Sequence, residues 1–325
     1  MNTTDRRATI GAIALAFGVL IATPAGAVPM VAPAFSGVYS IQSLGAVAGL
    51  PGPYGGLAFI DNDTLLIGGR ANEMDGRLYT IDVLRDGDGH ISGFSGVAAQ
   101  FGSVGEFNDG GVVFGPGGVL FTARYPENEL GQTLPGDLDE TRITNLTGLG
   151  VAVSPGGLMF VPPGLPGTGQ LKLVSWEGGE WYTLSLALAP DGTYDILAAV
   201  LGPTLPGGPE GIAYVPPGSP LFANPSVLIS EYSAGSVAVY EVDASGNPIV
   251  ASRLDFVLGL TGAEGALVDP VTGDFLFSTF LLDGGDEVLR VRGFVPPPPV
   301  PEPGSLLLLG LGLAGLRLAR RRPAR

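Results

Sequence analysis

The chain has 325 residues, of which 45% are hydrophobic, and its formal net charge is −15 at pH 7. Nearly half of the arginines lie near the two ends, so the middle of the chain is still more acidic, which excludes nucleic acid as a partner. There is no cysteine, so an exported form would have to rest on a large hydrophobic core instead of disulfides. An acidic surface would attract cations such as Ca²⁺, or would simply keep the protein soluble.

Residues 1–27 have the three parts of a secretory signal peptide. Arg6 and Arg7 form a basic start, residues 10–22 are apolar, and Ala25 and Ala27 are the small residues of a cleavage site. This pattern predicts export and cleavage after Ala27. The alternative is an N-terminal membrane anchor.

Similar segments recur along the middle of the chain. Each starts with a small or acidic residue and a glycine, and an apolar strand follows; the starts are residues 55–59, 110–114, 149–153, 210–214 and 264–268. Turns rich in Gly, Pro, Asn and Asp then lead into further short strands, with a period of about 50 residues. Four antiparallel strands in each such repeat resemble a β-propeller.

We therefore predict an all-β fold, a propeller of about five four-stranded blades over residues 28–294. A sixth blade hidden in a loop and a β-sandwich are the alternatives. Residues 127–145 are polar, so the second blade should be degenerate. The last repeat ends after its third strand, at residues 287–294, and residues 37–47 form a spare strand. We expect this strand to complete the last blade and close the ring.

The strand starts are the candidate site, because the first strand of each blade lines the central channel. Glu210 and Glu264 occupy equivalent positions, and Asn108 and Asp109 lie close to that position in the second repeat. Oxygen ligands that converge from several blades could bind Ca²⁺ at the channel mouth. In the alternative interpretation, Arg70 and Arg124 on neighbouring loops form salt bridges with the two glutamates.

Evidence for catalysis in the sequence is sparse. Pro209-Glu210-Gly211-Ile212 resembles the Glu-Gly strand start of calcium-dependent six-bladed lactonases, a resemblance that implies a calcium-dependent hydrolase or lactonase. The blade count and the missing remainder of that family's site argue against it, so we predict no catalytic residue. Before His90, the only histidine, Asp86-Gly87-Asp88-Gly89 lacks the terminal carboxylates of an EF-hand loop and predicts a hairpin turn. Trp176 and Trp181 either stack on sugar rings or pack in a blade.

The C-terminal region has its own organisation. Residues 295–300 are proline-rich and predict a stiff linker. A Pro-Glu-Pro box, a short apolar segment at 304–316 and an arginine cluster follow in that order; the box and the cluster are Pro301, Glu302, Pro303, Arg320, Arg321 and Arg322. This order over residues 301–325 resembles the PEP-CTERM sorting signal of Gram-negative bacteria. The alternative is an amphipathic helix packed on the core.

The resemblance implies export through the inner membrane, transient retention there by a short transmembrane segment, and processing by an exosortase. The mature protein would then reside in the periplasm, the outer envelope or on the cell surface. We therefore predict an exported, non-catalytic binding or scaffold protein whose partner is exopolysaccharide or another envelope component. No cofactor is expected apart from Ca²⁺ at the strand starts.

Overall fold

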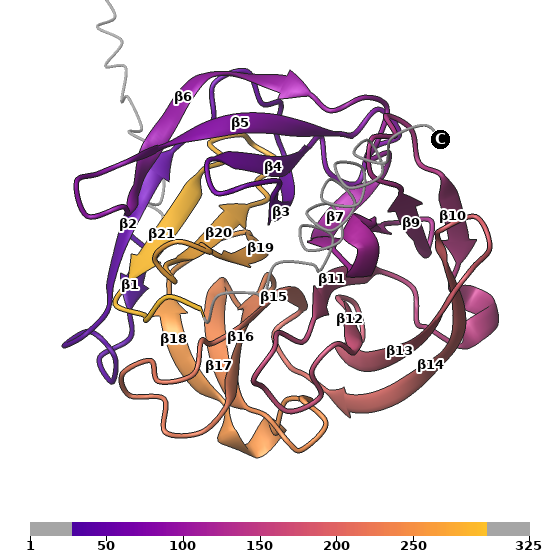
Figure 1. Cartoon of the computed structure of the whole chain (residues 1–325). Coiled ribbons are helices and arrows are strands. Elements are labelled where there is room, and N and C mark those ends of the chain that lie inside the picture. Colours follow the sequence, from indigo (N-terminus) through magenta and orange to yellow (C-terminus); the bar gives the residue numbers. More distant parts are fainter. Residues whose placement is uncertain (1–27, 298–325) are drawn as a thin grey trace, which may run out of the picture.

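The computed structural model describes residues 28–297, which form five antiparallel sheets arranged around a central axis (Figure 1). Each sheet is one blade of a β-propeller, with strands that follow one another from the axis outward. The predicted signal peptide, the transmembrane segment and the sorting signal lie outside the described residues. Within residues 28–297, no helix has the length and apolar character needed to cross a bilayer.

Every blade has the same order of strands. The inner strands, from blade 1 to blade 5, are β3 (Tyr54–Phe59), β7 (Asn108–Phe114), β11 (Pro155–Phe160), β15 (Pro209–Tyr214) and β19 (Ala263–Val268). The second strands are β4 (Thr64–Gly69), β8 (Leu120–Arg124), β12 (Leu171–Ser175), β16 (Ser226–Glu231) and β20 (Phe275–Thr279). The third strands are β5 (Arg77–Arg85), β9 (Glu129–Thr133), β13 (Glu180–Leu188), β17 (Ser236–Glu241) and β21 (Val288–Arg292). The outer strands are β6 (Ile91–Gln100), β10 (Arg142–Asn145), β14 (Tyr194–Thr204), β18 (Leu254–Leu258) and β2 (Ser40–Gly45).

The count of five blades is confirmed, and two details of the prediction are corrected. Residues 149–153 are not an inner strand, because a 3₁₀ turn at Thr147–Leu149 and a left-handed Gly150 (φ 77°) interrupt the chain there. The inner strand of blade 3 is β11, which begins a few residues after this interruption. Blade 2 is also complete, since the polar segment 127–145 forms β9 and β10.

The recurring glycine has a packing reason. A Cβ atom at the second residue of each Gly-Gly or Glu-Gly pair would meet the backbone carbonyl oxygen of the next inner strand around the ring. The five pairs are Gly56 with Gly110, Gly111 with Gly156, Gly157 with Glu210, Gly211 with Glu264, and Gly265 with Gly55. The inner strands therefore approach one another too closely for any side chain at this position, and the contacts form a closed cycle.

The N-terminal segment closes the ring, as predicted. Strand β2 pairs with β21 and becomes the outer strand of blade 5. The sequence did not predict β1 (Met30–Val31), which pairs with β18 and adds a fifth strand to blade 4. Between these strands, Phe35 and Tyr39 enter an aromatic cluster with Phe222, Phe256 and Phe294. The segment therefore joins blades 4 and 5 by strand pairing and by core packing.

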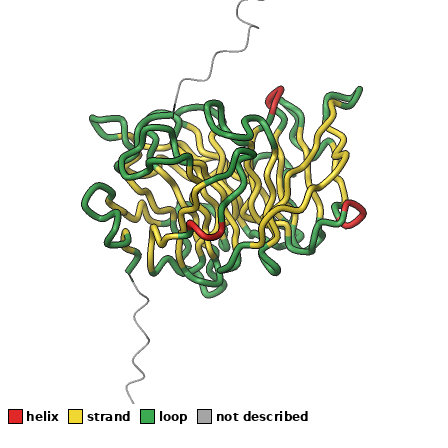
Figure 2. Tube along the Cα trace, turned by 90° about the horizontal axis from the view of Figure 1, so that it is seen from below, coloured by secondary structure: helices red, strands yellow, loops and turns green. Residues whose placement is uncertain are grey.

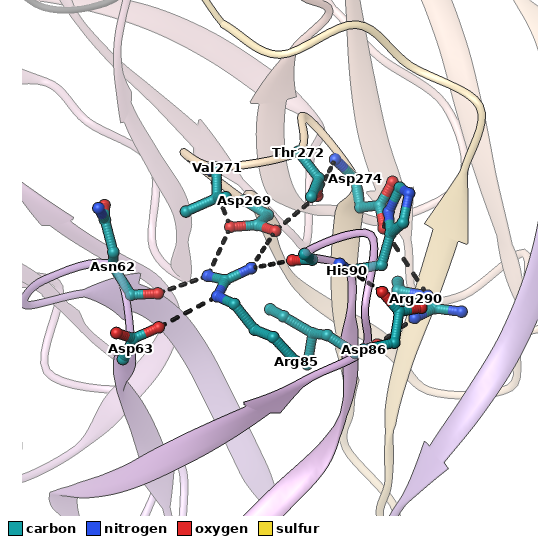
Figure 3. A network of polar contacts seen from close by, with 12 residues as sticks. Asn62, Asp63, Arg85, Asp86, His90, Asp269, Val271, Thr272, Asp274 and Arg290 are labelled. Atoms are coloured by element: carbon teal, nitrogen blue, oxygen red, sulfur yellow. Dashed lines mark hydrogen bonds and ion pairs between the residues drawn. The ribbon is translucent and has the colours of Figure 1, made fainter.

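Blades 1 and 5 are joined by polar contacts (Figure 3). Arg85 forms two bonds to the fully buried Asp269, at 2.8 and 3.0 Å, and a third to Asp63 at 3.1 Å. The predicted hairpin turn between β5 and β6 places His90 Nδ1 2.7 Å from Asp274. These contacts tie the turns of blade 1 to the turn between β19 and β20.

Viewed edge-on, the strands run between two faces that carry the loops (Figure 2). Neighbouring strands are antiparallel, so the start of each inner strand and the loop after each second strand lie on one face. The turns of the Arg85 network join first to second and third to fourth strands, and they lie on the opposite face. The predicted site residues therefore share the first face.

Candidate ligand site at the channel mouth

Three carboxylates from three blades meet at the start of the inner strands. Asp109 comes from β7, Glu210 from β15 and Glu264 from β19, and one oxygen of each lies within 4.8 Å of the others. Their exposed fractions are 2%, 4% and 2%, respectively. The geometry thus brings together three of the four residues that the sequence singled out, and we call them the carboxylate triad.

Glycines in the other blades make room for the triad. Glu210 and Glu264 occupy the position at which the inner strands of blades 1 to 3 have Gly55, Gly110 and Gly156. A Cβ atom on Gly110 would lie 3.1 Å from Glu210 Oε2 and 3.4 Å from Glu264 Oε1. A Cβ atom on Gly156 would fall on the Glu210 carboxylate. The two glutamate side chains therefore fill the space that the glycines leave at the axis.

Hydrogen bonds satisfy the triad only in part. The Asn72 amide nitrogen donates to Asp109 Oδ1 at 3.1 Å in the orientation that satisfies this amide. Asp109 also accepts from the Gly110 backbone and interacts with the Glu264 carboxyl. Glu210 Oε2 and Glu264 Oε1 are buried and have no hydrogen-bond partner. Two acceptors in the triad are thus left for a ligand.

Burial and mutual repulsion favour the protonated forms of these acids. Burial raises the pKa of Asp109 to about 6. Burial, and to a smaller extent the charge of Asp109, raises the pKa of Glu210 well above its ordinary value. Burial, together with the charges of Glu210 and Asp109, also raises the pKa of Glu264 well above its ordinary value. A cation bound at the triad would lower all three values, since it would favour the charged forms.

The predicted salt bridges to the glutamates are not formed. Arg70 pairs with Asp75 at 2.8 Å. Arg124 pairs with Glu129 at 3.2 Å and with Glu140. Within residues 28–297, no ion pair joins the triad to a basic side chain, so its charge has no internal counterion.

Asn108 lies beside the triad, but its side chain is used elsewhere. Its amide nitrogen donates to the Gly105 carbonyl at 2.8 Å and to the Gly69 carbonyl at 3.2 Å. Asn108 therefore supports the loop between blades 1 and 2. Its Oδ1 has no hydrogen-bond partner, but it lies against Gly55 and Gly68, and Asn108 is outside the lining of the pocket described below.

A pocket of about 470 Å³ opens above the triad. Its lining combines the triad and a fourth acid, Glu73, with aromatic, apolar and small polar residues, and the described lining contains no Arg, Lys or His. The lining residues are Pro53, Ala71, Asn72, Glu73, Asp109, Tyr125, Ser154, Trp176, Glu210, Tyr232, Glu264, Phe280 and Leu282. Asn72 and Ser154 have left-handed backbones, with φ of 66° and 70°. Strained residues of this kind are often found at functional sites.

Apart from Trp176, the aromatic wall of this pocket was not predicted from the sequence. Tyr125, Trp176, Tyr232 and Phe280 each follow directly after the second strand of a blade. The sequence signal for this wall is an aromatic residue directly after the second strand in four of the five repeats. The two tryptophans lie in different places: Trp176 lines the pocket, whereas Trp181 is fully buried between blades 3 and 4.

Comparison with known proteins identifies the tail of the chain. Residues 299–322 match the PEP-CTERM protein-sorting motif. No curated protein sequence matches the chain. Similar solved structures include an aldose sugar dehydrogenase from Streptomyces coelicolor, which is 16% identical over 77% of this chain and 83% of that chain, with a TM-score of 0.36.

A putative 6-phosphogluconolactonase from Bacteroides uniformis is 15% identical over 75% of this chain and 69% of that chain, with a TM-score of 0.41. Virginiamycin B lyase from Staphylococcus aureus is 12% identical over 78% of this chain and 99% of that chain, with a TM-score of 0.40. Values this low carry no information about activity. The chain therefore joins a five-bladed β-propeller to a PEP-CTERM protein-sorting motif, which implies export and exosortase-dependent sorting to the cell envelope or surface.

Proposed function

We propose that the propeller is a non-catalytic binding module of the cell envelope and that its ligand occupies the channel-mouth pocket. The observation that carries this proposal is the buried triad, which has no counterion among residues 28–297 and forms part of a pocket lining. Burying charged groups without a counterion is unfavourable, so such an arrangement is expected where a ligand supplies the missing charge. The partner would be exopolysaccharide or another envelope component that presents a cation.

Calcium is the inorganic cation that suits these donors. Ca²⁺ binds six to eight oxygen atoms, and carboxylates are its usual protein ligands. Asp109, Glu210 and Glu264 would hold the ion, and the pocket has room for waters or ligand oxygens that complete its shell. Bound Ca²⁺ would neutralise most of the triad charge.

Calorimetric titration with CaCl₂ tests cation binding at the triad. We expect the double variant Glu210→Gln, Glu264→Gln to bind at least tenfold more weakly than the native protein. The matched control is Asp191→Asn, Asp243→Asn, which alters two exposed acids far from the pocket lining. Equal affinity in the two double variants would contradict a role for the triad in Ca²⁺ binding.

A calcium-dependent hydrolase or lactonase is the second candidate. The observation in its favour is Asp109, whose pKa of about 6 suits a general base near neutral pH and whose side chain reaches the pocket. Lactone hydrolysis that requires Ca²⁺ and disappears in Asp109→Asn would favour this candidate. Binding of cations without such turnover would favour the binding module.

A further inference from the structure

The aromatic residues above the triad form a repeated feature of the fold. Tyr125, Trp176, Tyr232 and Phe280 stand at one equivalent position in blades 2 to 5, immediately after the second strand. This position lies on the same face as the inner strand starts, so each aromatic side chain lines the pocket that the triad also lines. We call these four residues the aromatic collar.

Successive rings of the collar stand nearly perpendicular to one another. Tyr125 and Trp176 have ring centroids 6.4 Å apart at 70°, and Trp176 and Tyr232 lie 6.1 Å apart at 83°. Tyr232 and Phe280 lie 5.9 Å apart at 82°. The four rings therefore form one continuous chain of edge-to-face contacts around the pocket.

The collar is open at blade 1. Arg70 occupies the equivalent position there, and its guanidinium turns to Asp75 instead of the pocket. Pro53 and Ala71 line this side. A ligand group held within the collar could thus carry a substituent that extends out of the pocket on the side of blade 1.

The lower part of the pocket presents unpartnered carboxyl oxygens and no basic residue. Glu210 Oε2 and Glu264 Oε1 are unpartnered acceptors on side chains that are at least 96% buried, given exposed fractions of 4% and 2%. Both residues line the pocket, and no basic residue is among the described lining. A ligand that uses the whole pocket therefore directs a positive charge toward the triad and apolar groups toward the aromatic collar.

We propose that the pocket binds an organic ammonium group, with its charge above the triad and its alkyl substituents against the aromatic collar. This inference rests on the proposed function and names the class of its ligand. An ammonium ion uses both parts of the site, because aromatic faces attract cations and carboxylates neutralise them. A hydrated metal ion would leave the rings unused, and a neutral sugar would make no use of the attraction that carboxylates and aromatic faces both have for a cation.

Calorimetry with simple probes tests the ligand class. Tetramethylammonium and choline are titrated against the neutral choline isostere 3,3-dimethyl-1-butanol and against CaCl₂. We expect the isostere to bind at least tenfold more weakly than choline. Isostere binding as tight as that of choline would overturn the ammonium class.

Collar variants separate this inference from the proposed function. Trp176→Leu with Tyr232→Leu should weaken choline binding by about fivefold or more and change CaCl₂ affinity less than twofold. Tyr194→Leu is the control, because Tyr194 is half-buried but lies outside the pocket lining. Binding of Ca²⁺ alone, unaffected by the collar variant, would overturn the inference and leave the proposed function standing. Binding of neither cation would overturn both.

A measurement on the native protein covers the case in which the collar variant does not fold. Trp176 lines the pocket and Trp181 is fully buried, and these are the only two tryptophans in the chain. Choline should therefore change the tryptophan emission in a saturable way, and the neutral isostere should not. An unchanged spectrum at choline concentrations that saturate calorimetric binding would place the bound ammonium away from the collar and overturn the inference.

Discussion

At the scale of single residues, we expect the triad to lower the stability of the free protein. Three buried acids within 4.8 Å of one another lose their hydration and repel each other when ionised. Glutamine at Glu210 and Glu264 would keep the shape of the protonated acids and remove the charge. The free protein should therefore gain stability from changes that abolish cation binding.

The sign of the pH dependence follows from the raised pKa values. Asp109 has a pKa of about 6 in the folded protein against an ordinary value of 3.8, so the folded state binds more protons between these values. Its contribution to stability is fully present below about pH 4 and is lost as pH rises through about 6, and the two glutamates extend the loss to higher pH.

We therefore predict that the melting temperature in cation-free buffer rises when the pH falls from 8 to 5. Glu210→Gln with Glu264→Gln should raise the melting temperature at pH 8 and flatten this dependence. Differential scanning calorimetry of both proteins provides the measurement. A double variant that melts lower than the native protein at pH 8 would show that the triad stabilises the fold.

At the scale of secondary-structure elements, the inner strands are held together by close backbone contact. The prediction concerns Gly157, where a Cβ atom would fall on the Glu210 carbonyl oxygen and lie 2.9 Å from the Ile212 side chain. Gly157→Ala should lower the free energy of unfolding by about 2–3 kcal/mol, because the neighbouring strand must move. Urea denaturation measures the difference.

Gly93→Ala in β6 is the matched control. No atom lies within 4 Å of a Cβ at Gly93, so this change should be neutral or stabilising by about 0.5 kcal/mol. Similar loss of stability in both variants would mean that glycine matters here for strand conformation and not for the approach of blades.

The N-terminal segment is the second element whose role is testable. Tyr39 is 3% exposed, and its ring centroid lies 4.5 Å from that of Phe294 and 5.5 Å from that of Phe256. Tyr39→Ala should reduce the free energy of unfolding by about 3–5 kcal/mol, as is usual when a large core side chain is removed. Val38→Ala next to it should have little effect, since Val38 is 43% exposed.

Deletion of residues 36–46 extends this test from one side chain to the whole strand. It would expose the edge of β21 and part of the core of blade 5. We expect cooperative unfolding at a lower temperature or aggregation. Unchanged melting of the deletion variant would show that blade 5 is stable with three strands.

At the scale of the whole molecule, the propeller is closed by strand pairing on one side and by side chains on another. Strands β1 and β2 join blades 4 and 5, and the bidentate pair of Arg85 and Asp269 joins blades 5 and 1. The triad and the collar lie on the face opposite to the Arg85 network. Ring closure and ligand binding thus use separate residues, so binding-site variants should leave the ring intact.

The last prediction concerns maturation of the whole chain. The PEP-CTERM motif at residues 299–322 leads us to expect a mature protein that lacks residues 1–27 and is cut near residues 301–305. Intact-mass measurement on protein from a host with an exosortase would detect both cleavages. A mass that retains the arginine cluster would contradict cleavage at the sorting signal.

Much of the architecture is encoded locally and could be predicted from the sequence. Glycine before an apolar run marks the inner strands, because five strands around one axis leave no space for a side chain there. The spare strand before the first repeat predicted closure of the last blade, since a three-stranded blade leaves an open edge. The same alignment placed Glu210 and Glu264 at equivalent positions at the start of inner strands, and the inner strands of a propeller lie next to its axis.

The tertiary structure alone decided the register of blade 3, the partners of the arginines and the existence of the collar. Residues 149–153 and 155–160 are both apolar runs after glycine, and only packing against β7 and β15 selects the second. Arg70 and Arg124 could reach several acids along the chain, and their partners depend on side-chain directions set by the surrounding loops. The collar residues lie about 50 residues apart, so their common pocket arises only when the ring closes.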